Sequence, residues 1–363
     1  MIGRRRVSLL VSGAIVVALM AVPSMAVAQK ATTTTPLPAP EQATPPSTGV
    51  TGATGTATNA APKPPPPKPD PRAPAHMSMK VHGIHRDGKL MVGKRARVTG
   101  YLRPFVEGQH VRVSLVHHGK VVRKLNPETK KVHGADKGVF HFKSMDLVKP
   151  GTYKVIANHE RTADQRGAVT RSKKFRIRYP DLDPGNRNSE VKVFNQLLSK
   201  QGFFTSHGKK YNVRTEWAVM AFRKTNGMKR TFNANAEIFK KLASGHGKYN
   251  LKYPGKGKHV EVDISKQVMV LANHGKPQHT FAVSTGAPAT PTIRGHYRFY
   301  RKDAGYNSLG MYYSVYFHGG YATHGYHSVP TYNASHGCVR NPIPDSIFIY
   351  NWIDLGDSIY VYD

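Results

Sequence analysis

The chain has 363 residues, with 54 Lys and Arg against 21 Asp and Glu, so its formal net charge at pH 7 is +33. This length allows two or three domains, and the basic excess indicates polyanionic surroundings, either nucleic acid or a cell wall with phosphate or carboxylate polymers. The cationic residues are spread along the chain, which favours a general adaptation of the protein surface to anionic surroundings over a DNA-binding groove. The single cysteine, Cys338, excludes an internal disulfide framework.

The first 28 residues have the features of an export signal. Three arginines, Arg4 to Arg6, precede an apolar run over residues 7–22, and Ala26-Val27-Ala28 offers the small residues that a signal peptidase accepts. The run is shorter than the about 20 apolar residues of a membrane-spanning helix. We expect cleavage after Ala28 and a location outside the cytoplasm, in the cell wall or periplasm. Retention of residues 1–28 as a membrane anchor is the alternative.

Residues 29–75 are mostly Thr, Pro, Ala, Gly and Ser and end in "PKPPPPKPDPRAP". This composition cannot bury a core and predicts a disordered spacer that is stiff at its proline-rich end. Over residues 76–179, runs such as "RARVTGYL" and "TYKVIANH" alternate with turn groups such as "HRDGK". That spacing predicts a β-sandwich of immunoglobulin-like type. Its histidines lack the spacing of metal ligands, so we read them as ordinary strand and loop residues.

Residues 181–244 change to a helical period. The segments "NSEVKVFNQLLSKQGFF", "VRTEWAVMAFRKTNG" and "NANAEIFKKLASG" each place apolar residues on one face, which predicts a bundle of three short helices. The order of elements resembles a peptidoglycan-binding domain of the three-helix type, and the resemblance implies wall binding. The segment "MKRTFNANAE" departs from the glycine-rich connection usual in that family. The residues that match its pattern are Val193, Gln196, Leu198, Gly202, Phe203, Thr215, Ala218, Val219, Phe222 and Leu242.

Residues 258–363 return to strand signals. "HVEVDISKQVMVLANHGKPQHTFAVSTG" reads as a hairpin, and "DSIFIYNWIDLGDSIYVYD" reads as a short helix and a final strand. We expect a mostly β domain with a face rich in Gly and Tyr. The chain as a whole is therefore predicted to be multidomain and mainly β.

The segment "ASHGCVRNP" holds Cys338 between small and polar residues. A thiol that only fills a core usually has apolar neighbours, whereas a neighbouring base or cation turns a cysteine into a nucleophile. The residues alone leave the base open between His336, in the same segment, and His324, at the end of "GGYATHG". Gly337 would let the backbone aim amides at a developing oxyanion.

The segment "HG…SHGCVR", with "FAVSTG…TPTIRG" ahead of it, resembles the catalytic core of the L,D-transpeptidases of bacterial cell walls. These enzymes share S/T-H-G-C-h-R/N with a His-Gly pair upstream, and the resemblance covers residues 258–363. It implies that Cys338 is acylated by a stem tetrapeptide and that His324 is the base. It further implies a nucleophile loop shaped by Ser335, His336 and Gly337, oxyanion donors in the amides of Gly337 and Cys338, and a carboxylate-binding Arg340.

Two departures from the family pattern qualify the site. The gap from His324 to Ser335 is short, and His318, with sixteen residues between it and Ser335, is a rival base on spacing. We prefer His324 because "ATHG" matches the His-Gly pair, whereas "FHGGY" is typical of a turn. Asn341 is the second departure and receives no role. Further candidates for substrate contact, for which a packing role is the alternative, are Gly325, Tyr326 and Tyr313.

The implied reaction is a two-step acyl transfer between peptidoglycan stem peptides that forms a 3→3 cross-link. Water in place of the acceptor amine would give an L,D-carboxypeptidase, and a silent site would leave a wall-binding protein. We expect no cofactor, no metal and no nucleic-acid partner, and we count anionic wall polymers among the candidate partners. The chain lacks an H-E-x-x-H spacing, which disfavours a zinc site built from His318, His324, His327 and His336.

Overall fold

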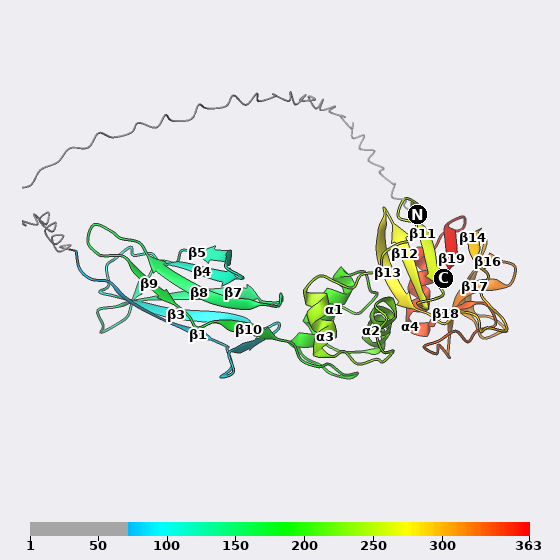
Figure 1. The fold of residues 1–363 in the computed structure, drawn as a ribbon, viewed down its shortest axis with the longest axis horizontal. Helices are drawn as coiled ribbons and strands as arrows, with labels where there is room; N and C mark the ends of the chain where they lie inside the picture. The colour runs from blue at the N-terminus through cyan, green and yellow to red at the C-terminus, as the bar shows by residue number, and fades with distance from the viewer. Residues whose placement is uncertain (1–71) are drawn as a thin grey trace, which may run out of the picture. The chain divides into compact units, whose positions relative to one another are not determined.

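The structure, a computed structural model, describes residues 72–363, apart from the side chains of residues 144–146. The predicted signal segment and the linker up to residue 71 lie outside the described residues. Within residues 72–363 no helix is long and apolar enough to cross a membrane. Figure 1 shows the described elements in chain order, from blue to red.

The predicted strands of residues 76–179 form two sheets. Their orders are β1-β3-β7-β6 and β2-β10-β8-β4-β5, with β9 beside β8. Buried and outward residues alternate along β3, as a sheet with one covered face requires. The immunoglobulin-like assignment stays a prediction. The strands are β1 (His76–His82), β2 (Lys89–Met91), β3 (Arg95–Arg103), β4 (Arg112–His117), β5 (Lys120–Leu125), β6 (Lys130–Lys131), β7 (Gly138–Asp146), β8 (Thr152–His159), β9 (Ala168–Arg171) and β10 (Phe175–Arg178).

Three helices follow, α1 (Ser189–Lys200), α2 (Val213–Thr225) and α3 (Ala236–Ala243). Each begins with the same device, because an asparagine side chain accepts a hydrogen bond from a backbone amide of the first turn. The caps are Asn188, Asn212 and Asn235. A glycine in the left-handed region follows each helix, with φ of 81°, 64° and 83° at Gly202, Gly227 and Gly245.

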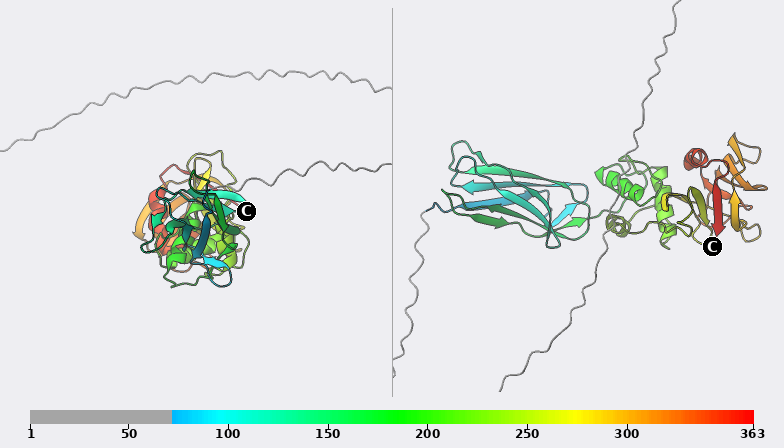
Figure 2. Two further views of the ribbon diagram at one scale, coloured as in Figure 1. Left: turned by 90° about the vertical axis from the view of Figure 1, so that its left-hand side faces the viewer. Right: turned by 90° about the horizontal axis from the view of Figure 1, so that it is seen from above.

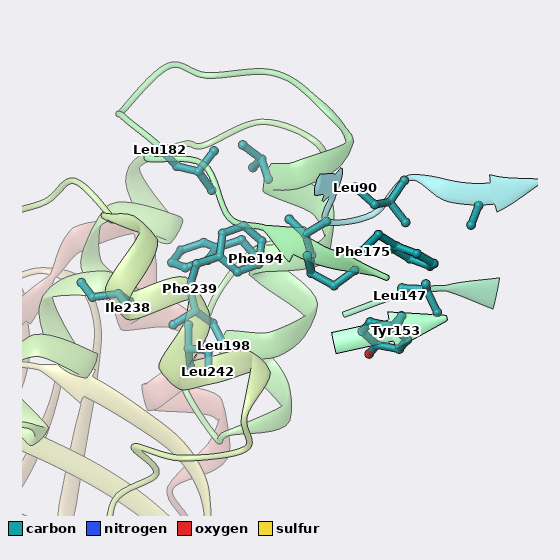
Figure 3. Close-up of a cluster of buried hydrophobic side chains, with 14 of the residues drawn as sticks. Leu90, Leu147, Tyr153, Phe175, Leu182, Phe194, Leu198, Ile238, Phe239 and Leu242 are labelled. Atoms are coloured by element: carbon teal, nitrogen blue, oxygen red, sulfur yellow. The ribbon is translucent and has the colours of Figure 1, made fainter. Parts of the chain in front are cut away.

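The apolar faces of these helices belong to a buried cluster that also contains strand residues. Figure 3 shows Phe194 and Phe239 of the helices among Leu198, Ile238 and Leu242, with Leu90, Phe175 and Tyr153 of the strands in the same view. The predicted apolar stripes of the helices are therefore core. Whether the helices bind peptidoglycan stays a prediction.

The remaining residues form a five-stranded sheet, β13-β12-β11-β19-β14, and a four-stranded sheet, β15-β16-β17-β18. Figure 2 shows this yellow-to-red region from two further sides. The mainly β prediction is confirmed. Its elements are β11 (His259–Asp263), β12 (Val268–Asn273), β13 (Lys276–Ala282), β14 (Gly295–Arg298), β15 (Arg301–Tyr306), β16 (Tyr312–His318), β17 (Tyr321–Tyr326), β18 (Val339–Pro342), α4 (Ile343–Trp352) and β19 (Ser358–Tyr362).

Helix α2 packs on β12, β13 and α4. At this contact Lys224 is buried and donates a 2.7 Å hydrogen bond from Nζ to the carbonyl oxygen of Val283. Arg214 donates a 2.8 Å bond to the carbonyl oxygen of Pro344, at the start of α4. Charged side chains of α2 thus donate hydrogen bonds to backbone carbonyl oxygens of residues 258–363.

Candidate active site

The register of β17 and β18 decides which side chains surround Cys338. The two strands are parallel, with Thr323 opposite Val339 and His324 opposite Arg340. Because side chains alternate between the faces of a sheet, the same face receives His324 and Arg340, and Cys338, two residues before Arg340, joins them. The opposite face carries Val339 into the core.

The face of Cys338 is apolar beside the thiol and cationic further out. Cys338 packs against a cluster of Met311, Tyr316 and Ala322. The guanidinium of Arg340 lies 4.3 Å from the centre of the Tyr326 ring. The guanidinium of Arg301, on β15 at the other edge of this sheet, stacks 3.9 Å from the centre of the Tyr316 ring and pairs with Asp303 at 2.8 Å. Arg340 is therefore the cation that an anionic group beside the thiol would meet.

The thiol of Cys338 is half-buried, and its Sγ lies 3.6 Å from the carbonyl oxygen of Gly320. Burial raises the pKa of this thiol, and the backbone amide of Ala322 and the charge of Arg340 act in the opposite direction. The neutral thiol is therefore the resting form at neutral pH. Such a thiol needs a base to become a nucleophile.

His324 has the protonation state and tautomer of a base. Its side chain is 3% exposed, and burial lowers its pKa to about 4, with the charge of Arg340 adding to the effect. The ring nitrogen Nδ1 lies 2.9 Å from the carbonyl oxygen of Gly325. Because a carbonyl only accepts, Nδ1 carries the hydrogen and Nε2 is left as the proton acceptor.

The loop before β18 is held by Ser335. Its hydroxyl donates a 2.5 Å bond to the carbonyl oxygen of Cys338 and accepts a 3.1 Å bond from the Gly337 amide. The resemblance implies that this amide stabilises the oxyanion, whereas here it is bonded to Ser335, which leaves the Cys338 amide as the candidate donor. Gly337 has φ +117°, and a Cβ there would lie 2.6 Å from Cε1 of Tyr321. Only glycine fits this position.

A second segment, residues 284–292, cradles this loop. The carbonyl oxygen of Thr285 accepts from the amides of Ala334 and Ser335, at 2.8 Å and 2.9 Å. The hydroxyl of Thr292 donates a 2.7 Å bond to the carbonyl oxygen of Gly337. These two threonines had no role predicted from the sequence; the signal that could have identified them is the small polar run "STGAPATPT".

The loop is also held from the helical region. Arg230 donates a hydrogen bond to the carbonyl oxygen of Thr331. Thr331 lies in the connection between β17 and β18 that ends at Cys338. A side chain outside residues 258–363 therefore touches the segment that delivers the thiol.

The other predicted histidines lie apart from the shared face. His336 is exposed on the loop. His318 pairs with Tyr321 after a register shift in β16, and its ring lies 5.1 Å from that of Tyr297. Tyr321 alternates onto the face opposite His324. The register thus favours His324 over His318 as the base.

The three candidates for substrate contact have packing partners in the structure, and their contact with substrate stays a prediction. Tyr313, at φ 50°, lies 5.1 Å from the ring of Tyr350 in α4. A Cβ on Gly325 would lie 2.1 Å from Oγ of Ser346, so Gly325 lets α4 approach β17. Tyr326 lies on the face of Cys338, beneath Arg340.

Asn341 acquires a role in the structure that the sequence did not reveal. It is buried, its side-chain amide donates a 3.2 Å bond to Oγ1 of Thr323, and its oxygen accepts a 2.8 Å bond from Oγ of Ser346. It therefore joins β17, β18 and α4. Among residues 72–363, no three or more His, Cys, Asp or Glu side chains gather closely enough to hold a metal ion.

Comparison with solved structures finds similarity to bacterial L,D-transpeptidases. One from Xylanimonas cellulosilytica is 29% identical, with 51% of this chain and 98% of that chain covered and a TM-score of 0.47. One from Stackebrandtia nassauensis is 22% identical, with coverage of 51% and 97% and a TM-score of 0.32. One from Mycobacterium tuberculosis H37Rv is 23% identical, with coverage of 30% and 58% and a TM-score of 0.28.

A comparison with curated proteins gives no match. A family model does match the last region, over residues 257–361, and its description is YkuD, the L,D-transpeptidase catalytic domain. These bounds agree with those predicted from "SHGCVR" and the strand pattern around it. Residues 257–361 of this chain therefore match the family of L,D-transpeptidase catalytic domains.

Proposed function

We propose that this chain is an exported cysteine L,D-transpeptidase that joins peptidoglycan stem peptides by 3→3 cross-links through a thioester on Cys338. The family match of residues 257–361 supports the reaction class. The observation that carries the finer proposal is the register of β17 and β18, which gives Cys338, His324 and Arg340 a common face. The predicted signal over residues 1–28 is the basis for export.

In the first step, the sulfur of Cys338 attacks the carbonyl carbon of the third stem residue while its proton moves to Nε2 of His324. The tetrahedral oxyanion faces the Cys338 amide. The carbon–nitrogen bond to the terminal D-Ala then breaks, and the proton on His324 passes to the departing amine. Acid–base help of this kind typically contributes about 10²–10⁴-fold to the rate.

In the second step, a side-chain amine of a neighbouring stem attacks the thioester. It loses a proton to His324, the carbon–sulfur bond breaks, and the proton returns to the sulfur of Cys338. An amide bond replaces the thioester and the enzyme is regenerated. Water in the place of the amine would give a shortened stem and the carboxypeptidase outcome.

The resting pair is a neutral thiol beside a neutral imidazole. This follows because burial raises the pKa of Cys338 and lowers that of His324. Proton transfer therefore accompanies the attack on the carbonyl and does not precede it. Arg340 is the residue that would receive the carboxylate of the terminal D-Ala and so hold the donor stem at the thiol.

The test is intact-protein mass after exposure to a carbapenem, beside a Cys338→Ala control. A single stable adduct that the control lacks is expected, since an activated thiol opens the lactam. Digested peptidoglycan incubated with the enzyme should then yield 3→3-linked dimers by mass spectrometry. Shortened monomers alone would favour a carboxypeptidase, and no adduct on folded protein would favour a wall-binding protein.

A matched pair of variants chooses the base. His324→Ala should abolish adduct formation on the time scale of the parent, whereas His318→Ala should retain it. The reverse result would transfer the role of base to His318. For export, the mature chain recovered from the culture should begin at Gln29.

A further inference from the structure

The outward face of the sheet β1-β3-β7-β6 is strongly cationic. The register aligns His82, Arg97 and Lys143 in one row across β1, β3 and β7. The next row contains Lys80 and His141, which flank Thr99. We name this surface the basic sheet face. Its members, all exposed, are His76, Lys80, His82, Arg97, Arg103, Lys130, His141 and Lys143.

Within the described part of the chain, the central cations of this face have no carboxylate partner. Among the residues that the structure describes, no carboxylate pairs with Lys80, Arg97 or Lys143. On the other sheet, Arg112 of β4 pairs with Glu160 at 2.5 Å. The positive charge of Lys80, Arg97 and Lys143 is therefore available to an anionic ligand.

A groove of about 1130 Å³ lies at one end of this face. Among the side chains that the structure describes, no Asp or Glu lines this groove, although Glu190 pairs with Lys94 at 3.5 Å. Residues of the helical region complete its wall. The cationic residues along it are Lys94, Arg95, Arg97, Lys143, Lys192 and Lys209.

In the absence of a ligand, this arrangement of like charges lowers the stability of the protein. Neighbouring strands lie about 4.8 Å apart, and alternate residues along a strand about 6.8 Å apart. Like charges directly opposite each other across strands are destabilising, and the row of Arg97 and Lys143 has that arrangement. A polyanion removes this repulsion and gains from the focused potential.

We propose that the basic sheet face and its groove bind a linear, phosphate-bearing polymer. A phosphate group carries oxygens that point in several directions, so it accepts at once from arginine and lysine on adjacent strands. A carboxylate has two coplanar oxygens and suits a single arginine fork better. A chain with repeated phosphates can follow successive rows of the face into the groove.

Nucleic acid is the competing polyanion, and the face lacks what a single strand requires. Base stacking needs exposed aromatic platforms. Tyr101 is the aromatic ring of the three central rows, and Lys137 covers it at 4.7 Å from the ring centre. This proposal stands on the sandwich region and is independent of the chemistry proposed at Cys338.

The test measures binding of the full chain to sodium polyphosphate of defined length, by fluorescence anisotropy at 50 and 200 mM salt. The variant is the triple charge reversal Lys80→Glu, Arg97→Glu and Lys143→Glu. Its matched control is Lys120→Glu, Lys124→Glu and Lys154→Glu on the other sheet, which changes the net charge equally. We expect the variant to bind roughly tenfold more weakly or worse, with a shallower salt dependence, and the control to bind like the parent.

Equal losses in variant and control would overturn the proposal, because net charge alone would then explain binding. So would undiminished binding by the variant. Poly-L-glutamate bound as tightly as polyphosphate would overturn the assignment to phosphate, and a DNA duplex bound more tightly would transfer the face to nucleic acid. Thermal unfolding checks that both triple variants fold; if the reversal does not, the Gln series at the same six positions replaces it.

Discussion

The amine of Lys224 in α2 lies 2.7 Å from the carbonyl oxygen of Val283, and the next residue, Ser284, exchanges two 2.9 Å backbone hydrogen bonds with Arg340. A buried cation of the helical region is thus two contacts from the strand that carries the site. Burial, with a contribution from the charge of Arg230, lowers the pKa of Lys224 to about 7.

This lysine makes stability depend on pH in a definite direction. The folded chain releases the proton of Lys224 near pH 7, whereas the unfolded chain holds it to about 10.4. Between these values the unfolded state binds more protons, so stability should rise with pH. Lys224→Met should remove that rise. The check is the unfolding temperature of parent and variant from pH 7 to 9.5; parallel curves would contradict it.

The acylation rate should follow the ionisation of His324. Its pKa is about 4 because it is buried, so the neutral base is fully present at neutral pH and is lost as pH falls through about 4. We expect the rate of carbapenem adduct formation to be flat from pH 6 down to about 5 and to decline below that. Stopped-flow or quenched mass spectrometry would measure it. A midpoint near 6.5, the ordinary value for histidine, would point to a different base.

Gly337→Ala should disable the site without unfolding the chain. The new Cβ would collide with Tyr321 and the residue would be held at φ +117°, so the loop must shift. A misplacement of about 1 Å at a reacting group can cost about 10²-fold in rate, and we expect a loss of that order in adduct formation. Gly255→Ala is the control, since a Cβ there meets nothing within 4 Å. Similar rates for both variants would contradict the assigned geometry.

Asn212→Ala should weaken α2. The side chain of Asn212 accepts from the Thr215 amide at 3.1 Å, and loss of such a cap typically costs ~1 kcal/mol. Chemical denaturation measures the change in unfolding free energy. Asn212→Ser keeps an accepting oxygen and should retain most of the stability; equal losses in both variants would show that the cap is not the cause.

Local signals were sufficient for much of this molecule. The helix ends at Gly202 and Gly227 follow from single residues and their neighbours. The motif around Cys338 was recognisable because its characteristic residues, "SHGCVR", are consecutive in the sequence. The run "RARVTGYL" likewise predicted a strand where β3 lies.

What the sequence did not reveal depends on contacts between distant segments. Thr292 donates a hydrogen bond to the carbonyl oxygen of Gly337, 45 positions along the chain, and no local sequence pattern predicts that hydrogen bond. The preference for His324 over His318 rested on the match of "ATHG" to the His-Gly pair, whereas a register shift in β16 is what separates their faces. Asn341 is explained only when β17 and α4 are in place around it.

The hydrogen bond from Arg230 to Thr331 has a consequence for dissection of the chain. A fragment that begins at residue 257 would retain Cys338, His324 and Arg340. It would lose the hydrogen bond from Arg230 to the loop that precedes Cys338. Such a fragment would contain the candidate catalytic residues but not the contact that positions their loop. In the whole protein, the helical region therefore contributes to positioning the catalytic loop.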